Sequence, residues 1–210
     1  MNYWVSKLKE DFGYNYTFGD PKTQYDLLKS SRLHPKYLLL NAARRGDFAL
    51  VKYAVELGAD VKEYDQLALF EAAGRGYLDI VNYLVSQGAD ILADGEKILQ
   101  EAAGNRQLEM VRYLVERGVN PEVGLESAIL GGNVDLIKYL VSKGVKIGSH
   151  ELLTALFSNK LEVMKYLVEI GINNPEMDPE LEAEFERDYR AGHIKPNVME
   201  YYRKHIVNKL

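Results

Sequence analysis

The chain has 210 residues, and 47% of them are hydrophobic, which is enough for one sizeable core or one elongated array. The formal net charge is −5, so general electrostatic binding of nucleic acid is not expected, because phosphate binding needs clustered lysine and arginine. The chain contains no cysteine, which excludes disulfides and thiolate metal sites and is typical of a reducing compartment.

Residues 1–36 lack the pattern that follows, and we predict that they form an N-terminal cap with Trp4 as its buried anchor. Thr23–Ser30 has the signals of a short helix, with Thr23 as its N-cap. A partner-binding peptide is the alternative for this segment. It has no apolar stretch typical of a signal peptide, and no run in the chain approaches the ~20 apolar residues of a membrane span. We therefore expect a cytoplasmic or nuclear protein with no membrane contact.

Residues 37–174 repeat one pattern five times. A tyrosine marks each copy, and a glycine follows it five residues later: Tyr53, Tyr83, Tyr113, Tyr139 and Tyr166 precede Gly58, Gly88, Gly118, Gly144 and Gly171. The spacings of 30, 30, 26 and 27 residues indicate an array of structural repeats. We divide the copies at 37–66, 67–96, 97–122, 123–149 and 150–174.

The second copy shows what each repeat is expected to form. An apolar run ends with Ala72 and Ala73, whose small side chains allow a neighbouring helix to approach closely. Apolar residues then recur at helical spacing from Leu78 to Val85, and Gly88 follows where a left-handed C-cap favours glycine. Each copy is therefore predicted to be a helix, a turn, a second helix and a loop. Stacked copies bury a continuous core.

Four features recur across the copies: paired alanines, a glycine before the second helix, a Val-x-Tyr-Leu-Val string and a Gly-Ala-Asp close. The paired alanines are at 42/43, 72/73 and 102/103, and the glycines are Gly46, Gly76 and Gly132. The Val-x-Tyr-Leu-Val string surrounds the marker tyrosines, and the Gly-Ala-Asp close is at 58–60 and 88–90. In these features residues Tyr37 to Asn174 resemble ankyrin repeats, most closely the versions found in large DNA viruses. The resemblance implies an all-α ankyrin-repeat solenoid of stacked helix-turn-helix units, with N- and C-terminal helical caps.

The sequence departs from ankyrin repeats in two respects. The usual Thr-Pro-Leu-His opening is absent, and Leu67–Phe70 stands in its place in the second copy. We expect apolar contacts to replace the hydrogen bonds of that motif. The periods are also shorter than the ~33 residues typical of the family, so short β-hairpin fingers are expected, above all between Gly118 and Gly144.

Residues 175–210 are predicted to form a C-terminal helical cap. Glu176–Asp188 contains seven acidic residues and two apolar residues spaced i and i+4, which predicts a short acidic helix. Gly192 and Pro196 end it, and Asn197–Lys209 is predicted to be a second helix. The alternative is a short recruiting motif, for example for a host ubiquitin-ligase adaptor, as in some viral ankyrin proteins.

No motif for catalysis, a cofactor or a metal is present. The four histidines, His34, His150, His193 and His205, do not pair at metal-binding spacing. Neither a phosphate-binding P-loop nor a dinucleotide fingerprint occurs. We therefore predict a protein that is not an enzyme and has no cofactor and no metal. A catalytic or nucleotide-binding role of the non-repeat ends is kept as an alternative.

The resemblance implies that a protein partner binds through the fingers and the exposed side of each first helix, which is the concave face in ankyrin proteins. The predicted partner-binding residues are Asn41, Arg44, Arg45, Lys62, Tyr64, Glu71, Arg75, Asp94, Glu101, Asn105 and Arg106. Of these, Lys62, Tyr64 and Asp94 are the candidates on the finger loops. Among them Arg45, Tyr64, Arg75 and Arg106 are the residue types favoured at hot spots. The alternative function is a viral inhibitor that blocks the active or assembly surface of a host defence protein. The partner's identity and the oligomeric state stay open.

Overall fold

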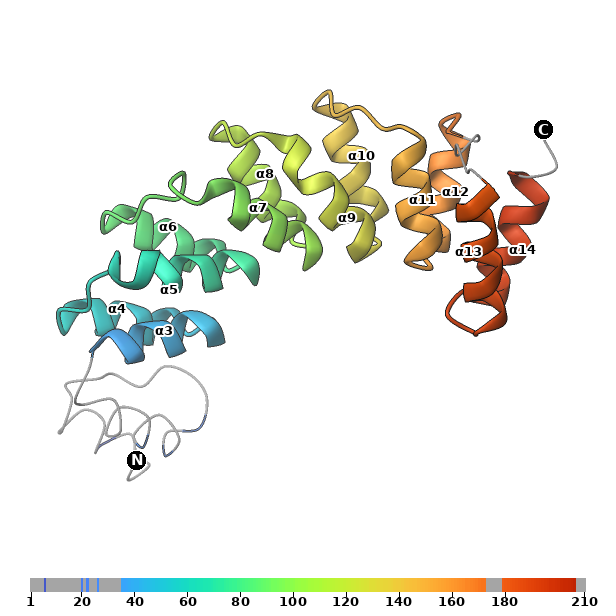
Figure 1. The fold of residues 1–210 in the computed structure, drawn as a ribbon. Coiled ribbons are helices and arrows are strands. Elements are labelled where there is room, and N and C mark those ends of the chain that lie inside the picture. The colour runs from blue at the N-terminus through green and yellow to red at the C-terminus, as the bar shows by residue number, and fades with distance from the viewer. Residues whose placement is uncertain are drawn as a thin grey trace. The chain divides into compact units, whose positions relative to one another are not determined.

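The computed structural model describes residues 35–172 and 179–206, together with residues 6, 20, 22 and 26. These residues form twelve α-helices, a 3-10 helix and no strand (Figure 1). The predicted N-terminal cap lies almost wholly outside the described residues, as do its anchor Trp4 and most of the predicted helix Thr23–Ser30.

The chain divides into two compact units, Met1–Asp94 and Gly95–Leu210. The helices of the first unit are α3 (Pro35–Arg45), α4 (Phe48–Glu56), α5 (Glu63–Gly74) and α6 (Leu78–Ser86). Those of the second unit are α7 (Gly95–Gly104), α8 (Leu108–Glu116), η1 (Pro121–Gly124), α9 (Leu125–Gly131), α10 (Val134–Ser142), α11 (Ser149–Phe157), α12 (Leu161–Glu169), α13 (Pro179–Arg190) and α14 (Pro196–His205).

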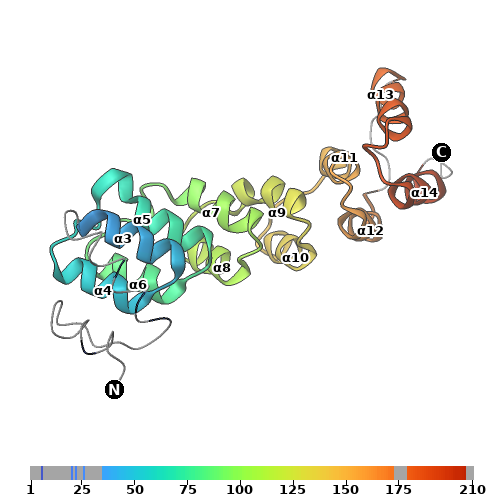
Figure 2. The ribbon, with the colours of Figure 1, turned by 90° about the horizontal axis from the view of Figure 1, so that it is seen from below.

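Consecutive helices form pairs, and within each unit the pairs lie side by side. In Figure 2 the first helices of neighbouring pairs, such as α3 and α5, stand in one row and the second helices, such as α4 and α6, in another. The first helices approach closely because their paired alanines, Ala42 and Ala43 in α3 for example, are fully buried. The second helices bury one apolar stripe each, as the sequence pattern predicts.

The turn inside each pair has the same backbone hydrogen bonds throughout. In the second pair the Gly76 amide donates to the Ala73 carbonyl and the Tyr77 amide to the Ala72 carbonyl, both at 3.0 Å. Gly76 has a φ of 78°, a left-handed conformation that glycine adopts without steric cost. The predicted left-handed cap at Gly88 is also present, with a φ of 101°.

Two first helices begin earlier than the sequence division places them. Helix α5 begins at Glu63 rather than after residue 66, and α7 begins at Gly95 rather than after residue 96. The chain turns early because the Asp60 and Asp90 side chains accept hydrogen bonds from the amides two residues on, at 2.9 and 3.0 Å.

A sixth helix pair follows the five predicted repeats. The turn between α13 and α14 contains the same hydrogen bonds, from the Gly192 amide to the Tyr189 carbonyl and from the His193 amide to the Asp188 carbonyl. Phe185 of α13 is fully buried, and its ring packs edge-on against Phe157 of α11 at 5.5 Å. The acidic C-terminal segment therefore has the backbone pattern of a repeat, which its composition concealed.

Tyr83, Tyr139 and Tyr166 each contact the second helix of the preceding pair. Tyr83 makes an edge contact with Phe48 at 5.6 Å, and the Arg112 guanidinium lies 4.6 Å from the Tyr139 ring centre. Their common place in the repeat is thus a packing position between neighbouring second helices.

A candidate protein-binding surface on the first helices

The predicted binding residues of the first unit lie on α3 and α5. Asn41 is half-buried in α3, and Arg44 and Arg45 are exposed in its last turn. Glu71 lies in α5, and Arg75 directly follows that helix. We call Arg44, Glu71 and Arg75 the arginine cluster, because the structure brings these three side chains together.

One carboxylate joins the two arginines of this cluster. The Arg44 Nε and Nη2 atoms lie 2.9 and 2.7 Å from Glu71 Oε1, and Arg75 Nη1 binds Glu71 Oε2. The Glu71 side chain is 15% exposed, whereas those of Arg44 and Arg75 are 45% and 44% exposed. Burial acts to raise the pKa of Glu71, but hydrogen bonds and charges from the two arginines outweigh it, so the pKa lies below its ordinary value.

The three residues predicted on fingers differ in their placement. Lys62 is exposed in the turn before α5, and Asp94 is half-buried in the turn before α7. The placement of Tyr64 in a loop is wrong, because it lies in the first turn of α5, and its side chain is outside the described residues.

The remaining predicted residues, Glu101, Asn105 and Arg106, belong to the second unit. Asn105 Nδ2 donates to Glu101 Oε1 at 2.8 Å. Arg106 Nε donates to the Gly131 carbonyl at 2.7 Å, so this arginine joins the third pair to the fourth. Arg106 therefore has a structural role that the sequence did not indicate.

Sequence reasoning missed two further residues that bond to backbone: Gln66 bonds the loop that follows α6 of its own pair, and Asn159 bonds the next pair. Gln66 Nε2 donates to the Asp90 carbonyl at 3.1 Å, and the Asp90 amide donates back to Gln66 Oε1. Asn159 Nδ2 donates to the His193 carbonyl at 2.8 Å, and the Lys195 amide donates to Asn159 Oδ1 at 2.6 Å.

Gln66, Arg106 and Asn159 also share a backbone feature. They are the non-glycine residues of the described chain with positive φ, at 62°, 63° and 58°. Arg106 and Asn159 occupy the turn position held by glycine in other copies, which is the signal that could have identified them. Arg106 and Asn159 thus join neighbouring pairs through polar bonds at the turn. The apolar contacts expected in place of the missing Thr-Pro-Leu-His motif, which belongs at the start of the first helix, stay a prediction.

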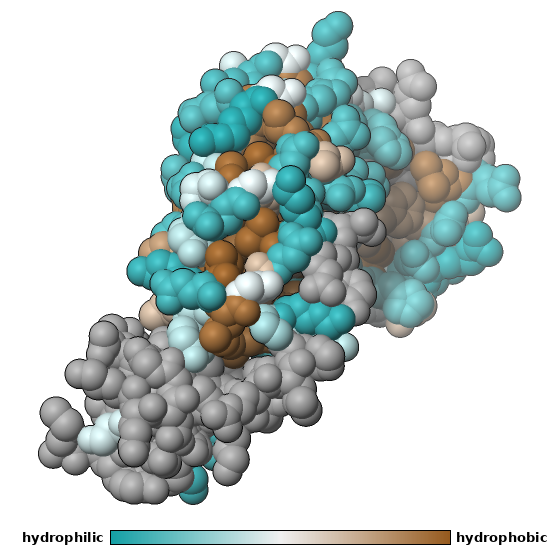
Figure 3. Space-filling view, turned by 90° about the vertical axis from the view of Figure 1, so that its left-hand side faces the viewer, coloured by the Kyte–Doolittle hydropathy of each residue, from teal (hydrophilic) through white to brown (hydrophobic). Residues whose placement is uncertain are grey.

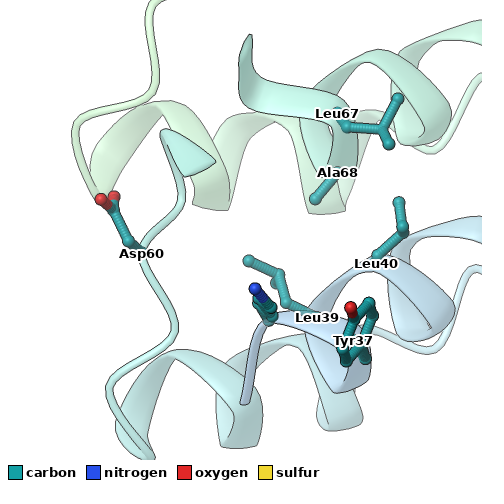
Figure 4. Close-up of a pocket in the computed structure, with 7 residues that line it drawn as sticks. Tyr37, Leu39, Leu40, Asp60, Leu67 and Ala68 are labelled. Carbon is teal, nitrogen blue, oxygen red and sulfur yellow. The ribbon is translucent and has the colours of Figure 1, made fainter. Parts of the chain in front are cut away.

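The described surface includes two hollows that differ in size and shape. A cleft of about 30 Å³ lies between α3 and α5 and is lined by Tyr37, Leu40, Leu67 and neighbours (Figure 4). Small-molecule sites usually have ~300–1,000 Å³, so this cleft admits only a small side chain. A wider, open groove of about 460 Å³ on α13 is lined by Glu182, Ala183, Glu186, Arg187 and Arg190.

Apolar side chains also reach the described surface, and Tyr37, Leu57 and Leu92 are among the large ones exposed there. Figure 3 shows a strip of apolar side chains bordered by polar ones on part of the face seen there. Such bordered strips are typical of protein-binding faces. Within the described residues no His, Cys, Asp and Glu side chains gather as a metal site would need. Among those same residues, no helix has the length and apolar character to cross a membrane.

Comparison with known proteins identifies the fold of these helix pairs. Residues 39–124 match the family model for ankyrin repeats, in three copies. The fold is the ankyrin-repeat fold. The crystal structure of the human ASB11 ankyrin repeat domain is similar, with a TM-score of 0.54 and 22% identity over 63% of this chain and 68% of that domain. No curated protein sequence matches the chain. Helix pairs α9–α14 lie outside the matched residues but have the same turn geometry. Ankyrin repeats generally mediate protein–protein interaction.

Proposed function

We propose that this ankyrin-repeat protein is a non-catalytic binding module that docks a protein partner on the exposed side of its first helices. The observation that carries the proposal is the arginine cluster. Arg44 in α3 and Arg75 directly after α5 are nearly half exposed and are oriented by a more buried carboxylate. Side chains held in this way lose little conformational freedom on binding, and arginine is a favoured hot-spot residue.

A charge-reversal variant tests the surface. Because Arg106 binds the Gly131 carbonyl, the test variant changes Arg44, Arg45 and Arg75 to Glu and leaves Arg106 intact. The control changes Arg117, Arg187 and Arg190, which are exposed elsewhere, and alters the net charge equally. We expect pull-down from cell extract to lose partners with the test variant only. Equal retention of partners by both folded variants would contradict the proposal.

The sequence alternative, inhibition of a host defence protein, uses the same surface and differs in its consequence. The viral resemblance on which it rests comes from the sequence alone. An activity assay on the captured protein distinguishes the two functions, because an inhibitor lowers that activity in proportion to the bound fraction, whereas a scaffold leaves it unchanged.

We further propose that residues 1–36 and 175–210 close the ends of the array. Support for the C-terminal part comes from α13, which buries Phe185 yet exposes polar residues along its groove. Terminal repeats with a polar outer face are required for solubility in such arrays. Changing Phe185 to Ala should expose the fifth pair and promote aggregation, as light scattering would show; an unchanged monomer would contradict this role.

A further inference from the structure

The arginine cluster still has hydrogen-bond donors that face solvent. Arg44 uses Nε and Nη2 on Glu71, and Arg75 uses Nη1 on the same carboxylate and on the Glu71 carbonyl. A guanidinium has five N–H donors, so each arginine keeps several for another acceptor. The surface thus presents two guanidinium groups of fixed orientation with spare donors.

The local charge of this surface is opposite to that of the chain. Arg44, Arg45 and Arg75 contribute +3 and Glu71 contributes −1, so the four residues carry a formal charge of +2 in a chain of −5. Arg45 directly follows Arg44 in the last turn of α3 and is also exposed. A ligand that complements it is an anion.

Two classes of anion fit a guanidinium, and the structure favours one. Arginine binds carboxylate and phosphate in paired hydrogen bonds. Binding to a nucleic-acid backbone depends on many cationic contacts made together. Three arginines beside a carboxylate, on a chain of net negative charge, do not provide these contacts. A carboxylate-rich protein segment, in contrast, needs only a few arginines close together.

We propose that the arginine cluster and Arg45 bind a carboxylate-rich segment of another protein. This inference rests on the proposed function and names the chemistry of its partner. The small cleft of Figure 4 lies between the same two helices, and Leu40 on its wall is one helical turn, ~6 Å, from Arg44. A bound segment therefore carries a small apolar side chain about one helical turn from its carboxylates.

Fluorescence anisotropy with three labelled probes tests this inference: hexaglutamate, hexalysine and a short oligothymidylate. At low ionic strength the full chain should bind hexaglutamate in preference to both others, and added salt should weaken the complex. Changing Arg44, Arg45 and Arg75 to Gln should weaken binding at least tenfold, whereas the same change at Arg117, Arg187 and Arg190 should alter it less than threefold. Tighter binding of the oligothymidylate, or equal weakening by both variants, would overturn the inference.

Glu71→Gln separates binding from a purely structural role. This change removes the negative charge between Arg44 and Arg75. We expect the gain in local positive charge to outweigh the loss of side-chain orientation, so the probe should bind several-fold more tightly. A purely structural role predicts the opposite, because loosening the cluster would then weaken binding of the probe as much as the triple variant does. Arg45→Gln leaves the cluster bonds intact and should still weaken binding measurably; no change in that variant would also count against the inference.

Two further outcomes show which proposal fails. If the charge-reversal variant loses its cellular partners while the wild type ignores hexaglutamate, the inference about carboxylates fails and the proposed function stands. If the charge-reversal variant keeps its partners and the wild type does not bind hexaglutamate, the proposed function fails on this surface as well. The acidic helix α13 of a second copy is another source of carboxylates. A concentration-dependent dimer of the wild type that is absent in the triple Gln variant would therefore overturn the assignment to another protein.

Discussion

Arg106 and Asn159 show how a single residue can exchange backbone strain for a bond to its neighbour. A non-glycine residue in the left-handed region costs roughly 1–2 kcal/mol, which is why glycine holds this turn at 46, 76 and 132. Each of the two larger residues directs its side chain to the backbone of the next helix pair. The strain is therefore offset by a contact that glycine cannot make.

Asn159 provides the test of this exchange. Asn159→Gly should destabilise the chain by ~0–2 kcal/mol, because it loses two hydrogen bonds but relieves the strain. Asn159→Ala loses the bonds and keeps the strain, so it should cost ~1–3 kcal/mol. Urea unfolding measures both. Gly192→Ala reports the backbone cost alone, because Gly192 has a φ of 81° at the same turn position and no atom lies within 4 Å of an added Cβ. If the two Asn159 variants are as stable as wild type, the bonds to His193 and Lys195 do not contribute.

Glu71 should make the stability of the chain sensitive to acid. Its pKa in the folded chain lies below the ordinary value of 4.5, so the unfolded chain binds the proton first as pH falls. The stabilisation is complete above about pH 5 and is lost as pH falls through the folded pKa. The urea midpoint of wild type should therefore approach that of Glu71→Gln between about pH 5 and pH 3. A constant difference across this range would exclude Glu71 as the cause.

At the scale of elements, the close packing of first helices depends on glycine as well as alanine. In the second unit α9 ends at Gly131, where an added Cβ would lie 2.8 Å from the Gly104 carbonyl oxygen and 3.3 Å from that of Ala103. These are backbone atoms of α7, which cannot move without displacing the helix. Gly104 itself has room, since a Cβ there would meet only Ser127 at 3.9 Å.

These two glycines make a matched pair of variants. Gly131→Ala should destabilise the chain by ~1–3 kcal/mol, because overpacking forces α7 and α9 apart. Gly104→Ala should be neutral or stabilising by up to ~1 kcal/mol, because alanine favours the helix. Thermal and urea unfolding compare them. Similar effects of the two changes would show that α7 and α9 do not approach as closely as described.

The sequence predicted the helices better than their connections, for a physical reason. Periodic apolar residues and fully buried alanines such as Ala72 and Ala73 fix which segments are helical and which faces are buried. The early start of α5 depends on an Asp60 side chain that bonds its own backbone, and the same residue type is equally frequent in loops. The shared carboxylate of Arg44 and Arg75 arises only when α3 and α5 lie side by side, which no local pattern encodes.

At the scale of the whole molecule, the same helix pair recurs, although the residue types in the buried stripe of its second helix change. Val198, Met199 and Tyr202 of α14 are buried as Ile80, Val81 and Leu84 are in α6. The sixth pair keeps this buried stripe even though its first helix is acidic. In repeat arrays stability is roughly a sum of pair terms and contacts between neighbours, so each such position contributes separately.

The tyrosines of the second helices extend this reasoning to alkaline pH. Burial raises the pKa of Tyr83, Tyr139, Tyr201 and Tyr202 above the ordinary value of 10.0, and nearby carboxylates add to the effect. Above about pH 10 the unfolded chain loses these protons while the folded chain keeps them, so stability falls as pH rises. Urea midpoints between about pH 8 and pH 11, with tyrosinate absorbance, should show unfolding and ionisation together. Tyr202→Phe keeps the ring contact with Phe185 at 5.0 Å and removes one ionising group, so its midpoint should fall less steeply. If the two slopes are equal, burial of the Tyr202 hydroxyl does not oppose its ionisation.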